Sequence, residues 1–323
     1  MTSETPPPLT YDPELRTFLT EGRLDDTSHL SLGQIPALRA QAPEAVAIST
    51  IKDLGFRTRE FLVPAFQDGI VAVSVIDRDR GETRSPCVYY IHGGGMVFGN
   101  RWDGLESVLP WIDRHQMTIV TVEYRLAPEF PAPYPVEDCY AGLTWIEKNA
   151  QDLGIDLGRL VIAGTSAGGG IAAGTALLAR DRKGPALLAQ ALFCPMLDDR
   201  DGTVSTVQFS GTGGWDRESN RVGWSALLGD DRCSERVSIY SAPARSASLV
   251  GLPPAFIDCG STEVFRDEDV DYASALWRDG VQAELHVWPG GFHCFDTAAP
   301  TADLSTSAIT ARDNWIARIL RNA

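Results

Sequence analysis

Positive charge and long apolar stretches are both scarce in this sequence. Lysine and arginine number 28 against 43 aspartates and glutamates, which gives a formal net charge of −15. Nucleic-acid binding needs a basic surface that displaces the counterions of phosphate, so this balance excludes a nucleic-acid partner and disfavours anionic membranes. No run approaches the roughly 20 apolar residues that span a bilayer, and the first residues lack the basic and apolar segments of a signal peptide. We therefore expect no membrane partner.

Cysteine motifs are missing as well. The six cysteines are scattered, and their spacings match neither the metal-binding nor the redox pattern C-x-x-C. Four of them, Cys87, Cys194, Cys259 and Cys294, lie in or beside apolar runs. We therefore predict that the cysteines are buried, reduced thiols in a cytoplasmic protein.

The rest of the composition is that of an ordinary globular chain. Of its 323 residues 44% are hydrophobic and 22% are charged, which excludes a disordered or low-complexity protein. The length suits two domains, and it suits one large α/β domain with an insertion equally well.

From about residue 56 the chain alternates short apolar runs with helical stretches. Continuous apolar runs of this kind are typical of parallel strands that are buried on both faces. The predicted strands are 56–63, 70–76, 87–92, 118–124, 160–164, 189–195, 255–260 and 283–288. The predicted helices are 102–115, 134–150, 167–181, 264–279 and 303–321. We expect a mostly parallel, doubly wound α/β sheet, whose active site lies at the carboxyl ends of the strands.

Residues 198–245 interrupt this alternation. The segment is too long for a loop between a strand and a helix in a compact sheet, so we predict a partly helical insertion. Together with residues 1–50 it forms a helical cap, and the catalytic domain takes 51–197 and 246–323. Several apolar side chains of the cap could line a pocket or only pack the cap onto the sheet. They are Leu15, Phe18, Leu19, Phe209, Trp215, Trp224, Leu227 and Leu228.

The segment Gly164-Thr165-Ser166-Ala167-Gly168 carries the strongest chemical motif. It follows a predicted strand and precedes a helix of small residues, which is the context that the nucleophile motif G-x-S-x-G requires. The serine must lie in a sharp, strained turn, and only small neighbours fit between the strand and the helix. The helix also directs its N-terminal amides and its positive dipole end at a developing oxyanion.

A second glycine-rich segment, His92-Gly93-Gly94-Gly95, follows the strand 87–92. Consecutive glycines let backbone amides approach a ligand oxygen closely. Two of these glycine amides, with the amide of Ala167, could form an oxyanion hole with three donors. A phosphate cradle is the alternative, but the residues that follow supply no lysine. We expect His92 to organise this loop.

A base is needed to activate Ser166, and the chain has five histidines. His293 follows the last predicted strand and a Pro-Gly-Gly turn, so it reaches the carboxyl edge of the sheet and is the preferred base. His29 and His115 are expected at the surface or in the cap, and His286 within a strand.

An acid that orients the imidazole should follow the strand 255–260, because the order along this type of fold is serine, acid, histidine. The candidates are Asp258, Glu263, Asp267, Glu268 and Asp269. Glu263 lies in the loop itself and is preferred, with Asp258 and Asp267 as reserves. The acids at the start of the next helix are also favoured there by the helix dipole alone.

Together these motifs resemble the hormone-sensitive-lipase-like family of α/β-hydrolase esterases. The matching segments are YYIHGGGMVFG (89–99), EYRLAPE (123–129), VEDCYAGLTW (136–145), AGTSAGG (163–169), EVFRDE (263–268) and PGGFHCF (289–295). The resemblance implies the α/β-hydrolase fold, Ser166 as nucleophile, His293 as base and Glu263 as acid. It also implies an oxyanion hole of the amides of Gly93, Gly94, Gly95 and Ala167.

Three residues depart from the common pattern of this family. Thr165 before the serine and Glu263 as the acid resemble the subgroup with a GTSAG elbow. Cys294 stands where glycine is common after the histidine. Within EYRLAPE, Arg125 and Glu129 are expected to anchor the loop behind the active site, with Asp138 pairing nearby.

The expected function is hydrolysis of short- to medium-chain carboxylic esters through an acyl-enzyme intermediate. Neither a metal nor an organic cofactor is required, and the partner is a small ester. The resemblance also implies a homodimer. The alternatives are an amidase or peptidase of the same fold and a non-catalytic small-ligand receptor on this scaffold; the presence of both Ser166 and His293 argues against the receptor.

Overall fold

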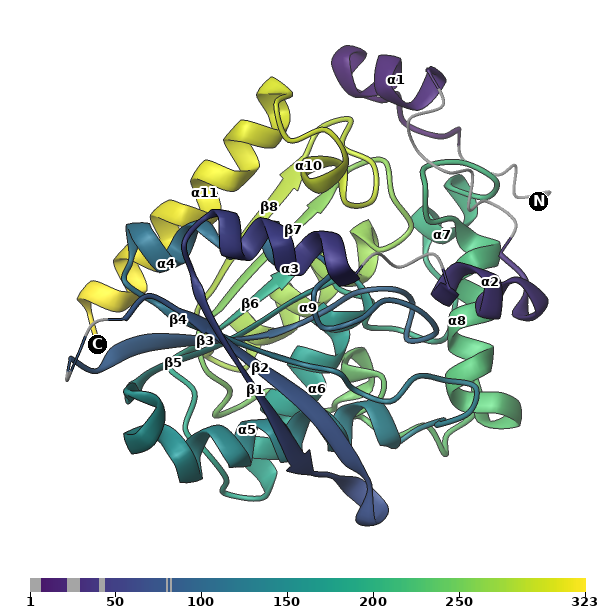
Figure 1. Ribbon diagram of the computed structural model, residues 1–323. Helices are drawn as coiled ribbons and strands as arrows, with labels where there is room; N and C mark the ends of the chain where they lie inside the picture. Colours follow the sequence, from purple (N-terminus) through teal and green to yellow (C-terminus); the bar gives the residue numbers. More distant parts are fainter. Residues whose placement is uncertain (1–6, 22–29, 41–43, 80, 82) are drawn as a thin grey trace.

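A twisted sheet of eight strands crosses the molecule and carries helices on both faces (Figure 1). The computed structural model describes residues 7–21, 30–40, 44–79, 81 and 83–323. The strands are β1 (Arg57–Pro64), β2 (Ile70–Asp77), β3 (Ser85–Ile91), β4 (Thr118–Val122), β5 (Ile155–Thr165), β6 (Ala189–Phe193), β7 (Ala255–Gly260) and β8 (Ala283–Trp288). Their order is β1-β2-β4-β3-β5-β6-β7-β8. β2 runs antiparallel to both neighbours and the other pairs are parallel.

The described part of the chain contains α-helices that cover both faces of the sheet and others outside these two layers. They are α1 (Pro13–Thr20), α2 (Ile35–Ala40), α3 (Glu44–Asp53), α4 (Pro110–Arg114), α5 (Tyr134–Leu153), α6 (Ala167–Asp181), α7 (Val204–Gln208), α8 (Arg217–Leu228), α9 (Arg266–Arg278), α10 (Phe295–Ala298) and α11 (Asp303–Arg321). One core cluster joins α5, α6 and α9 to the sheet, and a second joins α3, α4 and α11 to the opposite face. These two layers confirm the predicted doubly wound α/β fold.

The continuous apolar runs form the central strands, because helices cover both of their faces. Every residue of β3, β4, β6 and β7 is buried, whereas β1 at the sheet edge alternates between exposed and covered side chains. One predicted helix is different. Residues 102–115 form a short 3₁₀ turn and then α4, which begins with Pro110, a residue that suits the first position of a helix.

The two segments predicted as a cap contribute helices at different places. Residues 198–245 contain α7 and α8, and the N-terminal part contains α1, α2 and most of α3. Leu15 of α1 packs in a separate apolar cluster with Phe292 and Phe295. Ile51 of α3 packs in the core beneath the sheet. The predicted boundary between residues 50 and 51 therefore falls inside α3, and the division into domains stays a prediction.

An ion pair fixes the loop after β4. Arg125 contacts the fully buried carboxylate of Asp138 at 2.6 Å, and its guanidinium lies over the rings of Phe130 and Tyr134. Glu129 pairs with Arg39 at 2.9 Å. The anchoring role predicted for this loop is thus confirmed.

None of the six cysteines forms a disulfide, and their side chains differ in how far they are exposed. Cys87, Cys139, Cys194 and Cys259 are buried and Cys294 is partly buried, but Cys233 is exposed. The prediction is wrong for Cys233 because it lies in a polar turn of the insertion, after α8, where no apolar run covers it. Within the described ranges, every helix is too short or too polar to cross a membrane.

Candidate active site

Ser166 lies in a sharp turn between β5 and α6, at the carboxyl edge of the sheet. Its backbone has φ 58° and ψ −124°, a conformation that is strained for any residue with a β-carbon. The turn closes so tightly that a β-carbon on Gly164 would meet the carbonyl oxygen of Gly168 at 2.3 Å. A β-carbon on Gly168 would meet the carbonyl oxygen of Ile91 at 2.1 Å. Both glycines are therefore required by the turn that presents the serine.

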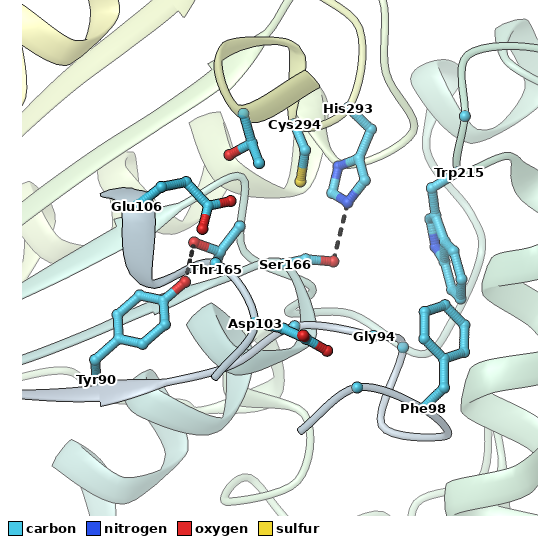
Figure 2. Close-up of a pocket in the computed structure, with 16 residues that line it drawn as sticks. Tyr90, Gly94, Phe98, Asp103, Glu106, Thr165, Ser166, Trp215, His293 and Cys294 are labelled. Carbon is cyan, nitrogen blue, oxygen red and sulfur yellow. Dashed lines mark hydrogen bonds between the residues drawn. The ribbon is translucent and has the colours of Figure 1, made fainter. Parts of the chain in front are cut away.

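A chain of hydrogen bonds joins three side chains from three separate loops. The Ser166 Oγ lies 2.9 Å from Nε2 of His293, and Nδ1 of the same ring lies 2.6 Å from Oε2 of Glu263 (Figure 2 shows the first of these contacts). When Nδ1 donates to the carboxylate, Nε2 is left as the acceptor for the serine hydroxyl. Ser166 is 5% exposed, His293 8% and Glu263 1%, so bulk water competes little for these bonds.

Glu263 is held at both of its oxygens. Oε1 accepts a hydrogen bond of 2.6 Å from the amide of Gly260, while Oε2 faces His293. The ring of Phe265 packs edge-on against the imidazole with the centroids 5.1 Å apart. The carboxylate and the ring therefore have little freedom to turn away from the serine.

The surroundings of His293 favour its protonated form. Burial lowers the pKa of the imidazole, whereas the nearby carboxylate of Glu263 raises it. Burial also raises the pKa of the Cys194 thiol well above its ordinary value, so that thiol is neutral near pH 7. Glu263 is then the partner that stabilises the imidazolium at working pH.

The glycine segment after β3 lies against the serine. A β-carbon on Gly93 would meet the carbonyl oxygen of Thr165 at 3.0 Å and Cβ of Ser166 at 3.4 Å. Within the described part of the chain, no carbonyl or side chain accepts a hydrogen bond from the amides of Gly94, Gly95 or Ala167. These donors are therefore available to an oxygen bound beside Ser166.

His92 holds this glycine segment in place through contacts with Gly93 and Tyr124. Its Nδ1 lies 2.8 Å from the carbonyl oxygen of Gly93, and its ring stacks on Tyr124 with centroids 4.2 Å apart. The Tyr124 hydroxyl donates to the carbonyl of His92 at 3.0 Å. Burial lowers the pKa of His92 to about 4, so it is neutral near pH 7. The expectation that His92 organises the loop agrees with these contacts.

The two reserve acids are engaged elsewhere. Both oxygens of Asp258 accept hydrogen bonds of 2.9 Å from the buried Arg312. Asp267 pairs with Arg266 at 2.7 Å and accepts from the amide of Ser205. Neither contacts His293, because Glu263 occupies the side of the ring that carries Nδ1.

The other histidines lie away from the serine. His115 pairs with Asp313 at 3.0 Å, which the sequence did not indicate. His286 of β8 contacts Glu284 at 3.0 Å and stacks on Trp288. His29 lies outside the described residues.

A cavity of about 510 Å³ opens above the serine (Figure 2). Its lining is mostly glycine, aromatic and small polar residues. The lining residues are Tyr90, Gly93, Gly94, Gly95, Phe98, Gly99, Asp103, Gly104, Glu106, Thr165, Ser166, Gly214, Trp215, His293, Cys294 and Thr297. Of the eight cap residues considered from the sequence, Trp215 alone belongs to this lining. The others pack in the core clusters, so for them the packing interpretation holds.

Several lining residues were missed in the sequence. Tyr90 is part of a predicted strand, and its hydroxyl lies 3.0 Å from that of Thr165. Asp103 and Glu106 lie in the stretch predicted as one helix. The stretch breaks into turns, which brings both acids to the cavity. Its only evident marks in the sequence are Gly104 and Pro110 within it.

One buried acid near the site has no evident partner. Asp269 of α9 is fully buried, and among the described residues neither carboxylate oxygen has a hydrogen-bond partner. Burial, with the nearby charges of Glu263 and Glu268, raises its pKa well above the ordinary value. Asp269 is therefore protonated in the folded state at a pH where the unfolded chain has lost that proton.

We expect Asp269→Asn to gain stability relative to the unchanged protein as pH rises. The unfolded carboxyl titrates near ~3.9, so above that pH folding takes up a proton and the free energy of unfolding falls. Each pH unit costs up to about 1.4 kcal/mol until the folded pKa is reached. Asparagine does not titrate, so the difference between variant and unchanged protein should grow as the pH rises above about 4. Urea unfolding at several pH values measures it, and a constant difference would contradict the assignment.

Comparisons with known proteins agree with this geometry. A family model described as the alpha/beta hydrolase fold matches residues 88–297. Carboxylesterase NlhH of Mycobacterium tuberculosis (strain ATCC 25618 / H37Rv) is 37% identical over 214 residues, which cover 64% of this chain and 66% of NlhH. The arylesterase of Saccharolobus solfataricus is 28% identical over 294 residues, which cover 89% of this chain and 92% of the arylesterase.

A solved structure extends the likeness over almost the whole chain. Bacterial heroin esterase superposes with a TM-score of 0.86 at 36% identity, covering 96% of this chain and 98% of the heroin esterase. The fold and the site are those of an α/β hydrolase. Within that class the chain belongs to the hormone-sensitive-lipase-like esterase family. The match to NlhH leaves about a third of that relative uncovered, since it spans 66% of its length.

Proposed function

We propose that this protein is a serine carboxylesterase that hydrolyses short- to medium-chain carboxylic esters through an acyl-enzyme intermediate. The observation that carries the proposal is the unbroken chain from the Ser166 hydroxyl through His293 to Glu263, with distances of 2.9 and 2.6 Å. Relatives named carboxylesterase, arylesterase and heroin esterase support ester hydrolysis as the reaction.

The first half of the reaction forms the acyl-enzyme. Ser166 attacks the ester carbonyl while Nε2 of His293 takes the hydroxyl proton, and the carboxylate of Glu263 stabilises the imidazolium that results. The charge that develops on the carbonyl oxygen is bound by amides of the 93–95 segment and of Ala167. Each such donor contributes about 10²–10³ in rate, because it binds the oxyanion more strongly than the ground-state carbonyl.

The second half releases the acid. His293 returns its proton to the departing alcohol, so the ring is neutral again and accepts a proton from water. The water attacks the acyl-enzyme, the tetrahedral oxyanion forms in the same place, and Ser166 recovers its proton from His293. Attack by the serine, release of the alcohol, attack by water and release of the acid need only the ester, a water molecule and groups of this chain.

The cavity sets the expected size of the acyl group. Its volume of about 510 Å³ lies in the lower half of the range for small-molecule sites. Phe98 and Trp215, whose ring centroids are 6.1 Å apart, form an apolar wall on one side. A short acyl chain fits against this wall, whereas a long one extends beyond it.

A panel of p-nitrophenyl esters tests the proposal. We expect turnover of the acetate and butyrate to exceed that of the octanoate, with the palmitate the slowest. The matching amide, p-nitroacetanilide, serves as the comparison for an amidase, and we expect its kcat/KM to be far lower. Faster amide than ester turnover favours an amidase, and binding without turnover of any ester favours a receptor.

Chelation gives a separate prediction. Because every proton transfer uses Ser166, His293 and water, exhaustive dialysis against EDTA should leave ester turnover at least as high as before. The measurement is the initial rate on p-nitrophenyl butyrate before and after dialysis. A loss that added Zn²⁺ or Mg²⁺ restores would contradict a mechanism without a metal.

A further inference from the structure

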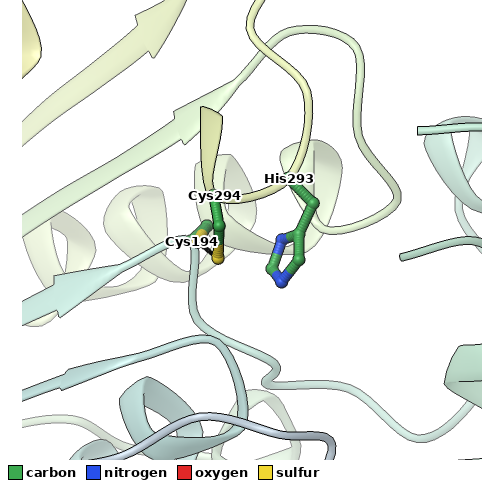
Figure 3. A group of neighbouring side chains, drawn as sticks. All are labelled: Cys194, His293 and Cys294. Atoms are coloured by element: carbon green, nitrogen blue, oxygen red, sulfur yellow. Dashed lines mark hydrogen bonds between the residues drawn. The ribbon is translucent and has the colours of Figure 1, made fainter. Parts of the chain in front are cut away.

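Two thiols lie beside the imidazole of His293 (Figure 3). The sulfur atoms of Cys194 and Cys294 are 3.6 Å apart. Both sulfurs and a ring nitrogen of His293 lie within 4.8 Å of one another. Cys194 immediately follows β6 and Cys294 precedes α10, so residues a hundred positions apart meet here. The hydrogen-bond chain from Ser166 to Glu263 includes neither thiol.

The backbone holds both cysteines in an unfavourable conformation. Cys194 has φ 39° and Cys294 has φ 57°, in the region that suits glycine and is costly for residues with a β-carbon. A glycine at either position would relieve this cost, and it would remove the sulfur.

We propose that Cys194, Cys294 and His293 bind a thiophilic divalent cation such as Zn²⁺, and that the bound cation inhibits the enzyme. Zinc binds thiolate sulfur at ~2.3 Å, so two thiolates on one tetrahedral zinc lie about 3.8 Å apart. The observed separation of 3.6 Å is close to that value before any movement. Thiolates and imidazole are also the ligand types that zinc prefers.

Charge and access agree with such a ligand. Each thiol gives its proton to solvent as the cation binds, and two thiolates with a neutral imidazole exactly offset the two positive charges. A buried metal site without net charge avoids the high cost of burying an unpaired charge. His293 and Cys294 line the cavity above Ser166, so the cation can enter from there and a water can complete its coordination.

The cation would remove the base from the esterase. Both ring nitrogens of His293 are already engaged, Nδ1 by Glu263 and Nε2 by Ser166. A cation on Nε2 breaks the bond to Ser166 and occupies the lone pair that accepts the serine proton. A cation on Nδ1 breaks the bond to Glu263 and leaves the ring proton on Nε2, so that nitrogen again has no free lone pair. Inhibition therefore rests on the proposed function, whereas binding of the cation does not.

Binding is measured first, with Co²⁺ as a spectroscopic probe on the reduced, full-length protein. We expect a thiolate-to-cobalt charge-transfer band in the unchanged protein and in Ser166→Ala, at one equivalent. Cys194→Ala and Cys294→Gly should lose the band, and glycine suits the backbone at 294, so that variant should fold. The matched control is Cys233→Ala, which removes the exposed thiol and should keep the band.

Inhibition is measured next, by titrating Zn²⁺ into p-nitrophenyl butyrate turnover. The unchanged protein and Cys233→Ala should be inhibited alike, and EDTA should restore both. For Cys194→Ala we expect the inhibitory concentration to rise by more than the ~10- to 100-fold that loss of a group supporting a metal ligand costs.

The two measurements separate the two proposals. The absence of a charge-transfer band in the unchanged protein overturns the metal site, whatever its turnover. Equal zinc sensitivity of Cys194→Ala, Cys294→Gly and the unchanged protein overturns it too. A band in the unchanged protein, together with no ester turnover by that same protein, leaves the metal site supported and overturns the proposed function instead.

Discussion

Ser166→Ala should lower kcat on p-nitrophenyl butyrate by about 10⁴- to 10⁶-fold, because no other group on the path replaces the attacking oxygen. The fold should be unaffected. The amide of Ser166 donates to the carbonyl of Phe193 and its carbonyl accepts from Met196, and both bonds use the backbone only. Circular dichroism and the unfolding midpoint should therefore match the unchanged protein while turnover is lost.

A second serine supplies the control for this experiment. Ser307 lies on the exposed side of α11 and bonds to the carbonyl of Asp303. Ser307→Ala should keep full turnover. Labelling with an organophosphate should add one adduct to the unchanged protein and to Ser307→Ala, and none to Ser166→Ala. Retention of a tenth or more of the turnover by Ser166→Ala would falsify the assignment of the nucleophile.

The fold was predictable because its main features are local in the sequence. Buried parallel strands must be apolar on both faces, so the runs that became β3, β4, β6 and β7 are visible without knowledge of their neighbours. The turn at Ser166 is also local, since its two flanking glycines are required by contacts within a few residues or with the adjacent strand.

Contacts between residues far apart in the sequence were not predictable. Glu263 and Asp258 differ by five positions; the loop position of Glu263 made it the preferred acid, but the sequence kept Asp258 in reserve. The difference between them comes from Arg312, more than fifty residues away, which engages Asp258 and holds it away from His293. The contact between Cys194 and Cys294 has the same character, because spacing along the chain carries no information about it.

The wall of the cavity was the least predictable part. Apolar side chains of a cap have the same pattern whether they face a substrate or a core. Only packing decides between the two, and it selected Trp215 for the cavity while Trp224 became fully buried. Asp103 and Glu106 reached the cavity because a stretch with helical periodicity broke into turns near Gly104.

The acid of the hydrogen-bond chain can be tested by Glu263→Gln, which should lower kcat by about 10⁴-fold. Glutamine keeps the shape of the side chain but loses the charge that stabilises the imidazolium. The substitution should also shift the pH dependence of kcat/KM in a definite direction. His293 acts as a base only when neutral, so the acid limb of kcat/KM follows the pKa of its imidazole, which the Glu263 carboxylate raises. Without the carboxylate the pKa falls, so the limb should move to lower pH while the plateau drops.

Substitutions of the two reserve acids serve as controls, and we expect Asp267→Asn to change little and Asp258→Asn to lower stability. Asp267→Asn should leave the rate near that of the unchanged protein, since the carboxylate of Asp267 is engaged by Arg266 and by the amide of Ser205 and not by His293. Asp258→Asn should cost stability, because the buried Arg312 then keeps Asp296 as its charged partner but loses the second carboxylate, and the cost should lie below the about 3–5 kcal/mol of breaking a buried pair completely. Its folded fraction should nevertheless turn over ester with an unshifted pH profile. A larger rate loss in Asp258→Asn than in Glu263→Gln, at equal folded fraction, would transfer the role of the acid to Asp258.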